Sequence, residues 1–341
     1  MRIALITDTW HPQVNGVVRT VEELEKRFRA RGHDIDIIHA VLFRNLPFPI
    51  YPELRMALFP GRELARRLES FRPDALHIMS EGPLGISARA YCRKKGYEFT
   101  TAYTTHWQLD LHSRMPGLVP VANAYLRWFH RPATKVFVDT EGLKEFLATI
   151  GLPHGAVTPL GVDTDTFVRT EDPLLPDFPK PVFLFFSRLS VEKSPEDFFR
   201  LDVPGTKLVI GDGPSGAMLK RKYGGGATFV GYKHGKELVA YISKADVLVF
   251  PSRTETFGLV VLEALACGVP VAAYDVMGPK DIITNGVDGC IGPDLKKSAL
   301  ACLSLSREDC RKKALVFSWE HATDAFLREV VPLIPSSSGK G

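Results

Sequence analysis

The feature that most constrains the fold is a regular alternation of short β-rich runs with amphipathic helical patterns. The run Ile3–Thr7 predicts a buried strand, and apolar residues recur every three or four positions in the helix expected from Val17 to Phe28. Gly32 then stands where a helix commonly ends. Such alternation is typical of doubly wound α/β domains with parallel sheets.

The alternation runs through the chain twice, and a turn-rich, Pro-rich segment at residues 159–181 separates the two series. A chain of 341 residues also exceeds what one hydrophobic core usually supports. We therefore expect two Rossmann-like domains. After the first strand, strands are expected at Ile35–His39, Ala75–Met79, Phe99–Thr104, Val136–Thr140, Val157–Leu160, Val182–Phe186, Lys207–Gly211, Thr228–Val230, Val247–Pro251, Val271–Tyr274 and Gly289–Ile291.

The domain boundaries are expected in this hinge and before the last helix. Residues 1–165 form the first domain, residues 166–316 the second, and residues 317–341 a C-terminal helix that packs back toward the first domain, with a frayed tail. Helical patterns cover residues 296–316 and 318–331. Because such sheets bind ligands at the carboxyl ends of their strands, the two domains are expected to face each other across a ligand cleft.

Charge and composition exclude several classes of function. The 43 Lys and Arg residues against 39 Asp and Glu leave a net charge of +4, too little for a protein that neutralises a long run of nucleic-acid phosphates. The five cysteines form no CxxC pair, which argues against a disulfide framework or a zinc knuckle and favours a reducing cytoplasm. The first apolar run ends at Asp8, too short for a signal peptide, and no run approaches the roughly 18 apolar residues of a transmembrane helix. Any membrane contact is therefore expected to be peripheral.

Two carboxylates, Glu255 and Glu263, frame a predicted helix start that follows a buried strand. The backbone amides of Phe257, Gly258 and Leu259 are expected to hold an anion such as phosphate, because the glycine allows close approach and the helix dipole favours negative charge. Carboxylates also accept hydrogen bonds from paired hydroxyls, as carbohydrate recognition requires. The alternative is a solvated loop charge and a surface helix residue. Since an idle charge among its apolar neighbours would be costly, Glu263 is expected to lie in a ligand cleft rather than in a core.

Two cations, Arg188 and Lys193, bracket a turn at the carboxyl end of the second domain's first strand. At that position they could neutralise a diphosphate, although a solvated loop pair is the alternative. Gly211 opens another tight turn at the same sheet edge, and Asn15-Gly16 precedes a helix start able to contact a phosphate or a sugar. The first loop, from Asp8 to Gly16, is not GxGxxG, and the sequence contains no GxxxxGK[ST], which argues against a nicotinamide enzyme and a P-loop NTPase.

Together these motifs resemble those of the glycosyltransferase family 4 enzymes, which have the GT-B fold, retain anomeric configuration and use nucleotide-diphosphate sugars. The resemblance covers nearly the whole chain, and the opening from Asp8 to Val18 looks most like glycolipid-forming members such as glycosyl-diacylglycerol synthases and mannosyltransferases. The motifs that carry it are Asn15-Gly16, Gly161-Val162-Asp163, Arg188 with Lys193, Gly211-Asp212-Gly213-Pro214, Glu255-x7-Glu263 and Phe317-Ser318-Trp319.

The resemblance implies a role for each motif. Arg188 and Lys193 would hold the diphosphate, Glu263 the ribose hydroxyls and Glu255 the transferred sugar. Such proteins often recognise the nucleotide base near the strand end that carries Tyr232. The donor sugar is expected to be UDP- or GDP-linked. The expected catalytic residues are Arg188, Lys193, Glu255 and His106, and the expected donor-binding residues are Gly16, Arg188, Lys193, Gly211, Tyr232, Glu255, Phe257, Gly258, Leu259 and Glu263.

One departure from the family pattern concerns the run from Tyr103 to Trp107. Many relatives carry a His-Thr pair after the fourth strand, with the histidine near the donor sugar, and here Thr104 takes the place of that histidine. His106 follows two residues later and so faces the same way on a strand. It either substitutes for the family histidine or makes a structural hydrogen bond or an acceptor contact.

The pairs Asp34-x-Asp36 and Asp163-x-Asp165 superficially match the metal-binding DxD of other glycosyltransferases. Both are interpreted as structural, because the first begins a strand and the second lies in the hinge. Arg188 and Lys193 would already supply the positive charge that a metal provides at a diphosphate. We expect no metal and no cofactor besides the nucleotide-diphosphate sugar used as co-substrate.

Residues 44–72 mix six arginines with three glutamates, a net charge of +3, and with interleaved apolar side chains. Such a segment can lie on an anionic leaflet, where each cation near the surface contributes about 1 kcal/mol. A solvated helix with a core-facing stripe is the alternative. The expected function is transfer of a hexose to a lipid acceptor such as diacylglycerol or a glycolipid, in the cytoplasm at the inner face of the membrane, with no nucleic-acid partner.

Three other functions stay open. The acceptor could be a lipopolysaccharide core or a soluble sugar. The chain could instead be a dinucleotide oxidoreductase, which nicotinamide binding without sugar-nucleotide binding would favour, or a non-catalytic membrane or polyanion adaptor that uses residues 44–72. The adaptor leaves the two charged motifs of the second domain unexplained. The sequence does not distinguish the base or choose among hexoses such as glucose, glucuronate and mannose.

Overall fold

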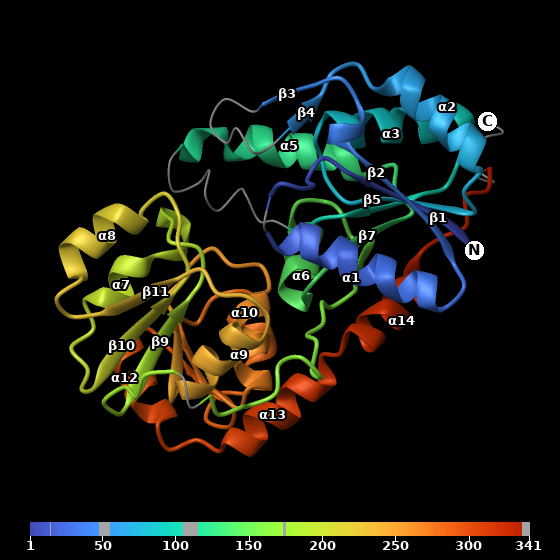
Figure 1. The fold of residues 1–341 in the computed structure, drawn as a ribbon. Helices are drawn as coiled ribbons and strands as arrows, with labels where there is room; N and C mark the ends of the chain where they lie inside the picture. Colours follow the sequence, from blue (N-terminus) through green and yellow to red (C-terminus); the bar gives the residue numbers. More distant parts are fainter. Residues whose placement is uncertain (14, 48–54, 105–114, 173–174, 336–341) are drawn as a thin grey trace. The chain divides into compact units, whose positions relative to one another are not determined.

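The computed structural model describes residues 1–13, 15–47, 55–104, 115–172 and 175–335. The chain divides into two compact units, Met1–Pro159 with Ala322–Gly341 (unit 1) and Leu160–His321 (unit 2), shown in Figure 1. Each unit contains a six-stranded sheet whose described strand pairs are all parallel. Two doubly wound α/β units are therefore present, as the alternation of strand and helix patterns predicts.

Unit 1 has the strand order β2-β1-β5-β6-β7-β8. The chain runs from β1 toward one side of the sheet and then returns to pair β5 with the other side of β1, so the two strands flank a switch point. The elements are β1 (Arg2–Thr7), α1 (Gly16–Ala30), β2 (Asp34–His39), η1 (Ala40–Leu42), β3 (Asn45–Pro47), β4 (Arg55–Ala57), α2 (Gly61–Phe71), β5 (Ala75–Ile78), α3 (Pro83–Lys95), β6 (Thr100–Ala102), η2 (Pro116–Leu118), α5 (Val119–His130), β7 (Lys135–Val138), α6 (Glu141–Thr149), β8 (Gly155–Val157) and α14 (Trp319–Glu329), of which α14 enters the unit at Ala322.

Alternate side chains of β1 build the two cores of unit 1. Ile3 and Leu5 pack with α1 and with Phe326 of α14, whereas Ala4 and Ile6 pack with α2, α3 and α5. Phe326 lies 5.1 Å from the ring centroid of Phe28, so the last helix completes the core on the α1 side. The helices thus cover both faces of the sheet and leave its carboxyl edge to the loops.

Unit 2 has the strand order β11-β10-β9-β12-β13-β14, and its switch point lies between β9 and β12. One face packs on α9, α10 and α13, and the other on α7, α8 and α12. The elements are β9 (Val182–Phe186), η3 (Val191–Lys193), α7 (Pro195–Phe199), β10 (Thr206–Ile210), α8 (Gly216–Tyr223), β11 (Thr228–Gly231), α9 (Gly235–Lys244), β12 (Val247–Phe250), α10 (Leu259–Ala266), β13 (Val271–Ala273), α11 (Pro279–Ile282), β14 (Gly289–Ile291), α12 (Leu295–Cys302) and α13 (Arg307–Val316).

Two local expectations are wrong. The last strand of unit 1 is Gly155–Val157 instead of Val157–Leu160, and the chain passes into unit 2 directly after Pro159. The helical pattern at 296–316 is two helices, because the Ser306 hydroxyl caps the second by accepting a hydrogen bond from the Asp309 amide. Residues 44–72 contain an antiparallel pair of strands, β3 with β4, in addition to the helix α2.

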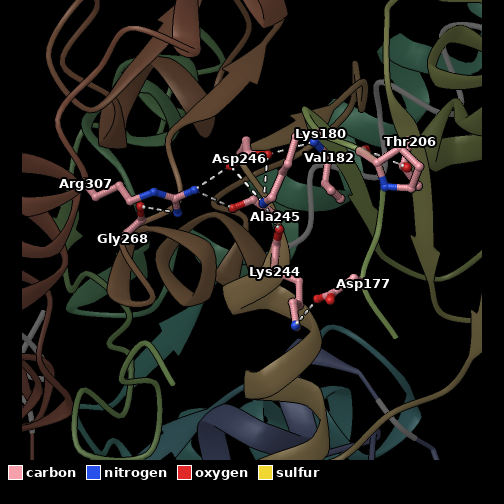
Figure 2. Close-up of polar contacts among 10 residues, drawn as sticks. Asp177, Lys180, Val182, Thr206, Lys244, Ala245, Asp246, Gly268 and Arg307 are labelled. Carbon is pink, nitrogen blue, oxygen red and sulfur yellow. Dashed lines mark hydrogen bonds and ion pairs between the residues drawn. The ribbon is translucent and has the colours of Figure 1, made fainter. Parts of the chain in front are cut away.

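An ionic network at the amino edge of the second sheet fixes the linker to unit 2 (Figure 2). The Asp246 carboxylate, just before β12, accepts hydrogen bonds from the Val182 amide at 2.8 Å, from Lys180 Nζ at 3.1 Å and from Arg307 Nη2 at 2.8 Å. Arg307 also donates to the backbone oxygens of Ala245 and Gly268. Burial lowers the pKa of Arg307 from its usual value. The network ties three segments together at the edge opposite the loops described next.

Candidate functional site

Four loops meet at the carboxyl edge of the second sheet, on either side of its switch point. The loop after β9 contacts the loop after β10 directly, since the Leu189 amide donates to the Asp212 carbonyl at 3.0 Å. The Tyr232 hydroxyl, after β11, donates to the same carbonyl at 2.9 Å. Gly211 must lack a side chain here, because its φ is +127° and a Cβ would lie 2.1 Å from the Ser187 carbonyl oxygen.

An ion pair joins the loops across the switch point. Lys193 ends the short helix η3 after β9, and its Nζ lies 2.5 Å from Oε2 of Glu255 in the loop after β12. The two side chains keep 26% and 15% of their surface exposed, so both reach solvent at this edge. A cation and a carboxylate held together at the ligand-binding position of the sheet suit a phosphorylated, hydroxyl-rich ligand.

The amino end of α10 lies beside this pair. Gly258 is its N-cap residue with φ of +98°, and no side chain in the described part of the chain caps it. The Val261 amide donates to the Gly258 carbonyl at 2.9 Å, which leaves the amides of Leu259 and Val260 to meet an anion. Gly278 packs directly against the same loop, because a Cβ there would lie 3.2 Å from the Phe257 amide nitrogen and from the Glu255 carbonyl oxygen. This close contact of Gly278 holds the backbone at Glu255 and Phe257 in the position that would face the ligand.

Two expected site residues are core residues. Glu263 is only 2% exposed and stands in α10 among Leu262 and Ala264, so it is not the surface helix residue of the alternative interpretation, and its contact with ribose hydroxyls stays a prediction. Its exposure is low because α10 is buried on nearly every side, including the face that carries Glu263. The Phe257 ring also packs into the core, 6.1 Å from Phe317, which leaves its backbone amide as the group that faces the loop.

The remaining expected donor-binding residues divide between the units. Arg188 is exposed beside Gly213, and Leu259 begins α10 half-buried. Gly16 lies in unit 1 as the first residue of α1, where the Asn15 side chain accepts a hydrogen bond from the Val18 amide at 3.1 Å. The structure therefore gathers the unit 2 residues at one sheet edge and places Gly16 at a helix start of the other unit.

His106 lies outside the described residues. One aspartate of each DxD pair has protein partners: Asp36 is bound by Arg67 through two hydrogen bonds of 2.8 and 2.5 Å, and Asp163 accepts bonds from the Asp165 amide and the Thr166 amide and hydroxyl. These contacts are those of structural residues. Among the described residues, no group of three or more His, Cys, Asp or Glu side chains is placed to hold a metal ion.

A clamp beneath the Glu255 loop was not expected from the sequence. Arg253 donates to Asp197 of α7 at 2.9 Å and stacks over the Tyr274 ring at 3.8 Å, and the Tyr274 hydroxyl donates to the same Asp197 oxygen at 2.8 Å. Burial, with the hydrogen bond to Asp197, raises the pKa of Tyr274 to about 12, which keeps its hydroxyl a donor. The sequence feature that could have indicated this contact is that Arg253 and Tyr274 each follow a strand, β12 and β13, and these strands are neighbours in the sheet.

Profiles of known glycosyltransferase families match both halves of the chain. The profile described as Glycosyltransferase Family 4 matches residues 14–166, and the profile described as Glycosyl transferases group 1 matches residues 180–308. The chain is 29% identical over 321 residues to a GDP-mannose-dependent alpha-mannosyltransferase of Mycobacterium tuberculosis, covering 86% of this chain and 84% of the relative. It is 24% identical over 330 residues to an alpha-monoglucosyldiacylglycerol synthase of Streptococcus pneumoniae, covering 85% and 75%.

The solved structures agree on the architecture. Sucrose-phosphate synthase from Thermosynechococcus elongatus matches with a TM-score of 0.76 over 96% of this chain and 97% of the other, at 22% identity. The two profiles fall mainly on unit 1 and on unit 2, so both Rossmann-like units are accounted for. The chain belongs to the family 4 glycosyltransferases, enzymes of GT-B fold, as the motifs of both sheets indicate.

Proposed function

We propose that the enzyme transfers a hexose, with retention of anomeric configuration, from a UDP- or GDP-sugar to a membrane lipid such as diacylglycerol or a glycolipid. The observation that carries the donor part is the Lys193–Glu255 pair beside the amino end of α10. A diphosphate at this edge would meet Lys193, Arg188 and the first amides of the helix, while Glu255 would accept hydrogen bonds from sugar hydroxyls.

The proposed chemistry depends on charge and position. Arg188 and Lys193 would stabilise the charge that develops on the departing diphosphate. The acceptor hydroxyl would attack the anomeric carbon from the face that the diphosphate leaves and pass its proton to the departing phosphate oxygen. Attack from that face gives retention without a covalent intermediate. Because Glu255 is held by Lys193, we assign it to sugar binding and not to nucleophilic attack.

Neutralisation of the diphosphate by side chains leaves no step for a metal. Turnover is therefore expected to persist in excess EDTA at a level close to that without chelator, measured as nucleotide release from the donor. A matched reaction with added magnesium or manganese serves as the control. Complete loss of activity with EDTA that either metal restores would contradict the metal-independent mechanism.

An apolar and cationic surface of unit 1 supports a lipid acceptor. Leu46 of β3, Leu58 after β4 and Phe59 are exposed, and Phe59 keeps 97% of its surface in solvent. Arg62 and Arg66 are exposed on the adjoining helix α2, and Arg66 also lines a hollow of about 310 Å³. Apolar side chains beside cations suit the interface of an anionic leaflet. Among the described residues, no helix has the length and apolarity needed to cross a bilayer.

The double variant Arg62→Gln/Arg66→Gln is expected to bind anionic vesicles about 30-fold more weakly, since each cation near the surface contributes about 1 kcal/mol. Arg67 is left in place, because its bond to Asp36 makes it structural. Co-sedimentation at two salt concentrations measures the effect, which should shrink at high salt. Lys297→Gln/Lys312→Gln, in unit 2, is the charge-matched control. Equal binding by wild type and double variant in every condition would contradict the membrane contact and favour a soluble sugar as the acceptor.

The function as a whole is tested by offering UDP- and GDP-linked glucose, glucuronate and mannose to the purified protein with diacylglycerol vesicles. Mass spectrometry of the lipid fraction should detect one hexosylated lipid. Product only on a lipopolysaccharide core or a soluble sugar would keep the donor assignment and overturn the lipid acceptor.

A further inference from the structure

In both units, charged residues follow the two strands that flank the switch point of the sheet. In unit 2 the strands at the switch point are β9 and β12, and the loops that follow them carry Lys193 and Glu255. In unit 1 the corresponding strands are β1 and β5, and the loops that follow them carry Asp8 and Glu81. Open α/β sheets bind ligands outside the carboxyl ends of the strands at this point.

The Asp8 carboxylate makes structural hydrogen bonds to the segment after β5. Its carboxylate accepts hydrogen bonds from the Ser80 hydroxyl at 2.9 Å and from the amides of Leu84 and Gly85, in the first turn of α3, at 2.9 and 3.2 Å. A Cβ on Gly82 would lie 2.5 Å from the Asp8 Cγ, so the backbone after β5 lies directly on this carboxylate. Asp8 thus caps α3 and fixes the segment that carries Glu81.

Glu81 is anchored on one side and reaches solvent on the other. One carboxylate oxygen lies 3.3 Å from Nε2 of the fully buried His130, and the Tyr125 hydroxyl donates to the Glu81 carbonyl. Because a carboxylate oxygen only accepts, Nε2 carries the proton, and in the neutral ring Nδ1 accepts from the Thr101 hydroxyl at 2.8 Å. The Glu81 side chain keeps 20% of its surface exposed.

The partners of Glu81 restrict its orientation without covering it. Burial raises the pKa of Tyr125 to about 12, so this residue stays a neutral donor. Arg89 holds the helix that carries Tyr125 and His130 by donating to the Phe129 carbonyl at 3.0 Å. A carboxylate fixed in this way loses little further conformational freedom when it binds a ligand.

We propose that Glu81 is the residue of unit 1 that binds the acceptor, by accepting hydrogen bonds from neighbouring hydroxyls of a polyol headgroup. His130 and Tyr125 act through it as positioning residues. This inference rests on the proposed function, because a family 4 glycosyltransferase must hold a hydroxyl-bearing acceptor as well as the donor. It adds the chemical class of the headgroup, a vicinal diol such as that of a sugar, and so favours a glycolipid over diacylglycerol, which has a single free hydroxyl.

The test uses the full chain and two soluble probes, glycerol and methyl α-D-mannopyranoside, with the donor that the panel identifies. Glu81→Gln and Glu81→Ala are expected to raise the KM for the probes about tenfold and up to 100-fold, the range for loss of a charge-assisted hydrogen bond. The donor Kd and the slow hydrolysis of the donor by water should stay within twofold of wild type. Glu145→Gln, at an exposed position of α6, is the matched control.

Tyr125→Phe separates positioning from stability. It should raise the probe KM by less than Glu81→Ala does, with kcat nearly unchanged and the melting temperature recorded alongside. A wild-type probe KM in both Glu81 variants, or a wild-type enzyme that shows no saturable dependence on either probe, would overturn the proposal. Transfer to the soluble probes that depends on Glu81, with no product on diacylglycerol, would exclude diacylglycerol as the acceptor and leave Glu81 assigned.

Discussion

Replacing Lys193 with alanine is expected to lower kcat/KM for the nucleotide sugar by about 100-fold or more. Two effects combine: the diphosphate loses a charge-assisted contact commonly worth roughly 1.5–3 kcal/mol, and Glu255 loses its partner at 2.5 Å and then repels the donor. Lys193→Ala should also weaken nucleotide binding in calorimetry. Circular dichroism should show the same fold, since Lys193 lies at the sheet edge with 26% of its side chain exposed.

The double variant Lys193→Ala/Glu255→Gln tests the second effect. Removing the unpaired charge should restore part of the donor affinity, so the two substitutions are expected to be non-additive. Lys296→Ala is the control, because that lysine pairs with an Asp202 carboxylate that is 97% exposed. Wild-type kinetics in a folded Lys193→Ala protein would remove the diphosphate role.

Replacing Asp246 with alanine is expected to destabilise unit 2 by about 2–3 kcal/mol, because Arg307 and the Val182 amide would lose an acceptor that is 21% exposed. For a unit of this size the melting temperature should fall by roughly 5–10 °C. Differential scanning calorimetry measures the change. The donor Kd at 25 °C should stay unchanged, because Asp246 directly precedes β12 at the amino edge of the sheet, whereas Glu255 follows that strand at the carboxyl edge.

Figure 2 also shows the control residue. Asp177 pairs with Lys244 at 3.1 Å, but its carboxylate is 99% exposed, so Asp177→Asn is expected to leave the melting temperature within about 1 °C. Equal effects of the two substitutions would mean that the Asp246 network contributes no more than an exposed ion pair.

Much of the candidate site follows from local sequence. Arg188, Lys193 and Glu255 could be assigned to one sheet edge because each follows a predicted strand, and parallel strands bring their carboxyl ends together. The clamp of Arg253 with Asp197 and Tyr274 could not be predicted, since it joins residues 56 and 77 positions apart. For the same reason, the pattern of residues 44–72 does not distinguish Arg67, which pairs with Asp36, from the arginines that face solvent.

The sequence by itself determined the fold class, the two series of strands and the turns that carry the charged motifs, because periodicity and turn residues act within about twenty neighbouring positions. The tertiary structure alone decided which charges meet. Lys193 and Glu255 are 62 positions apart and pair because β9 and β12 are neighbours at the switch point. The burial of Glu263 and the contact of His130 with Glu81 also depend on tertiary structure. In both cases the neighbouring residues are far away in the sequence and are brought close by the crossover connections of the sheet.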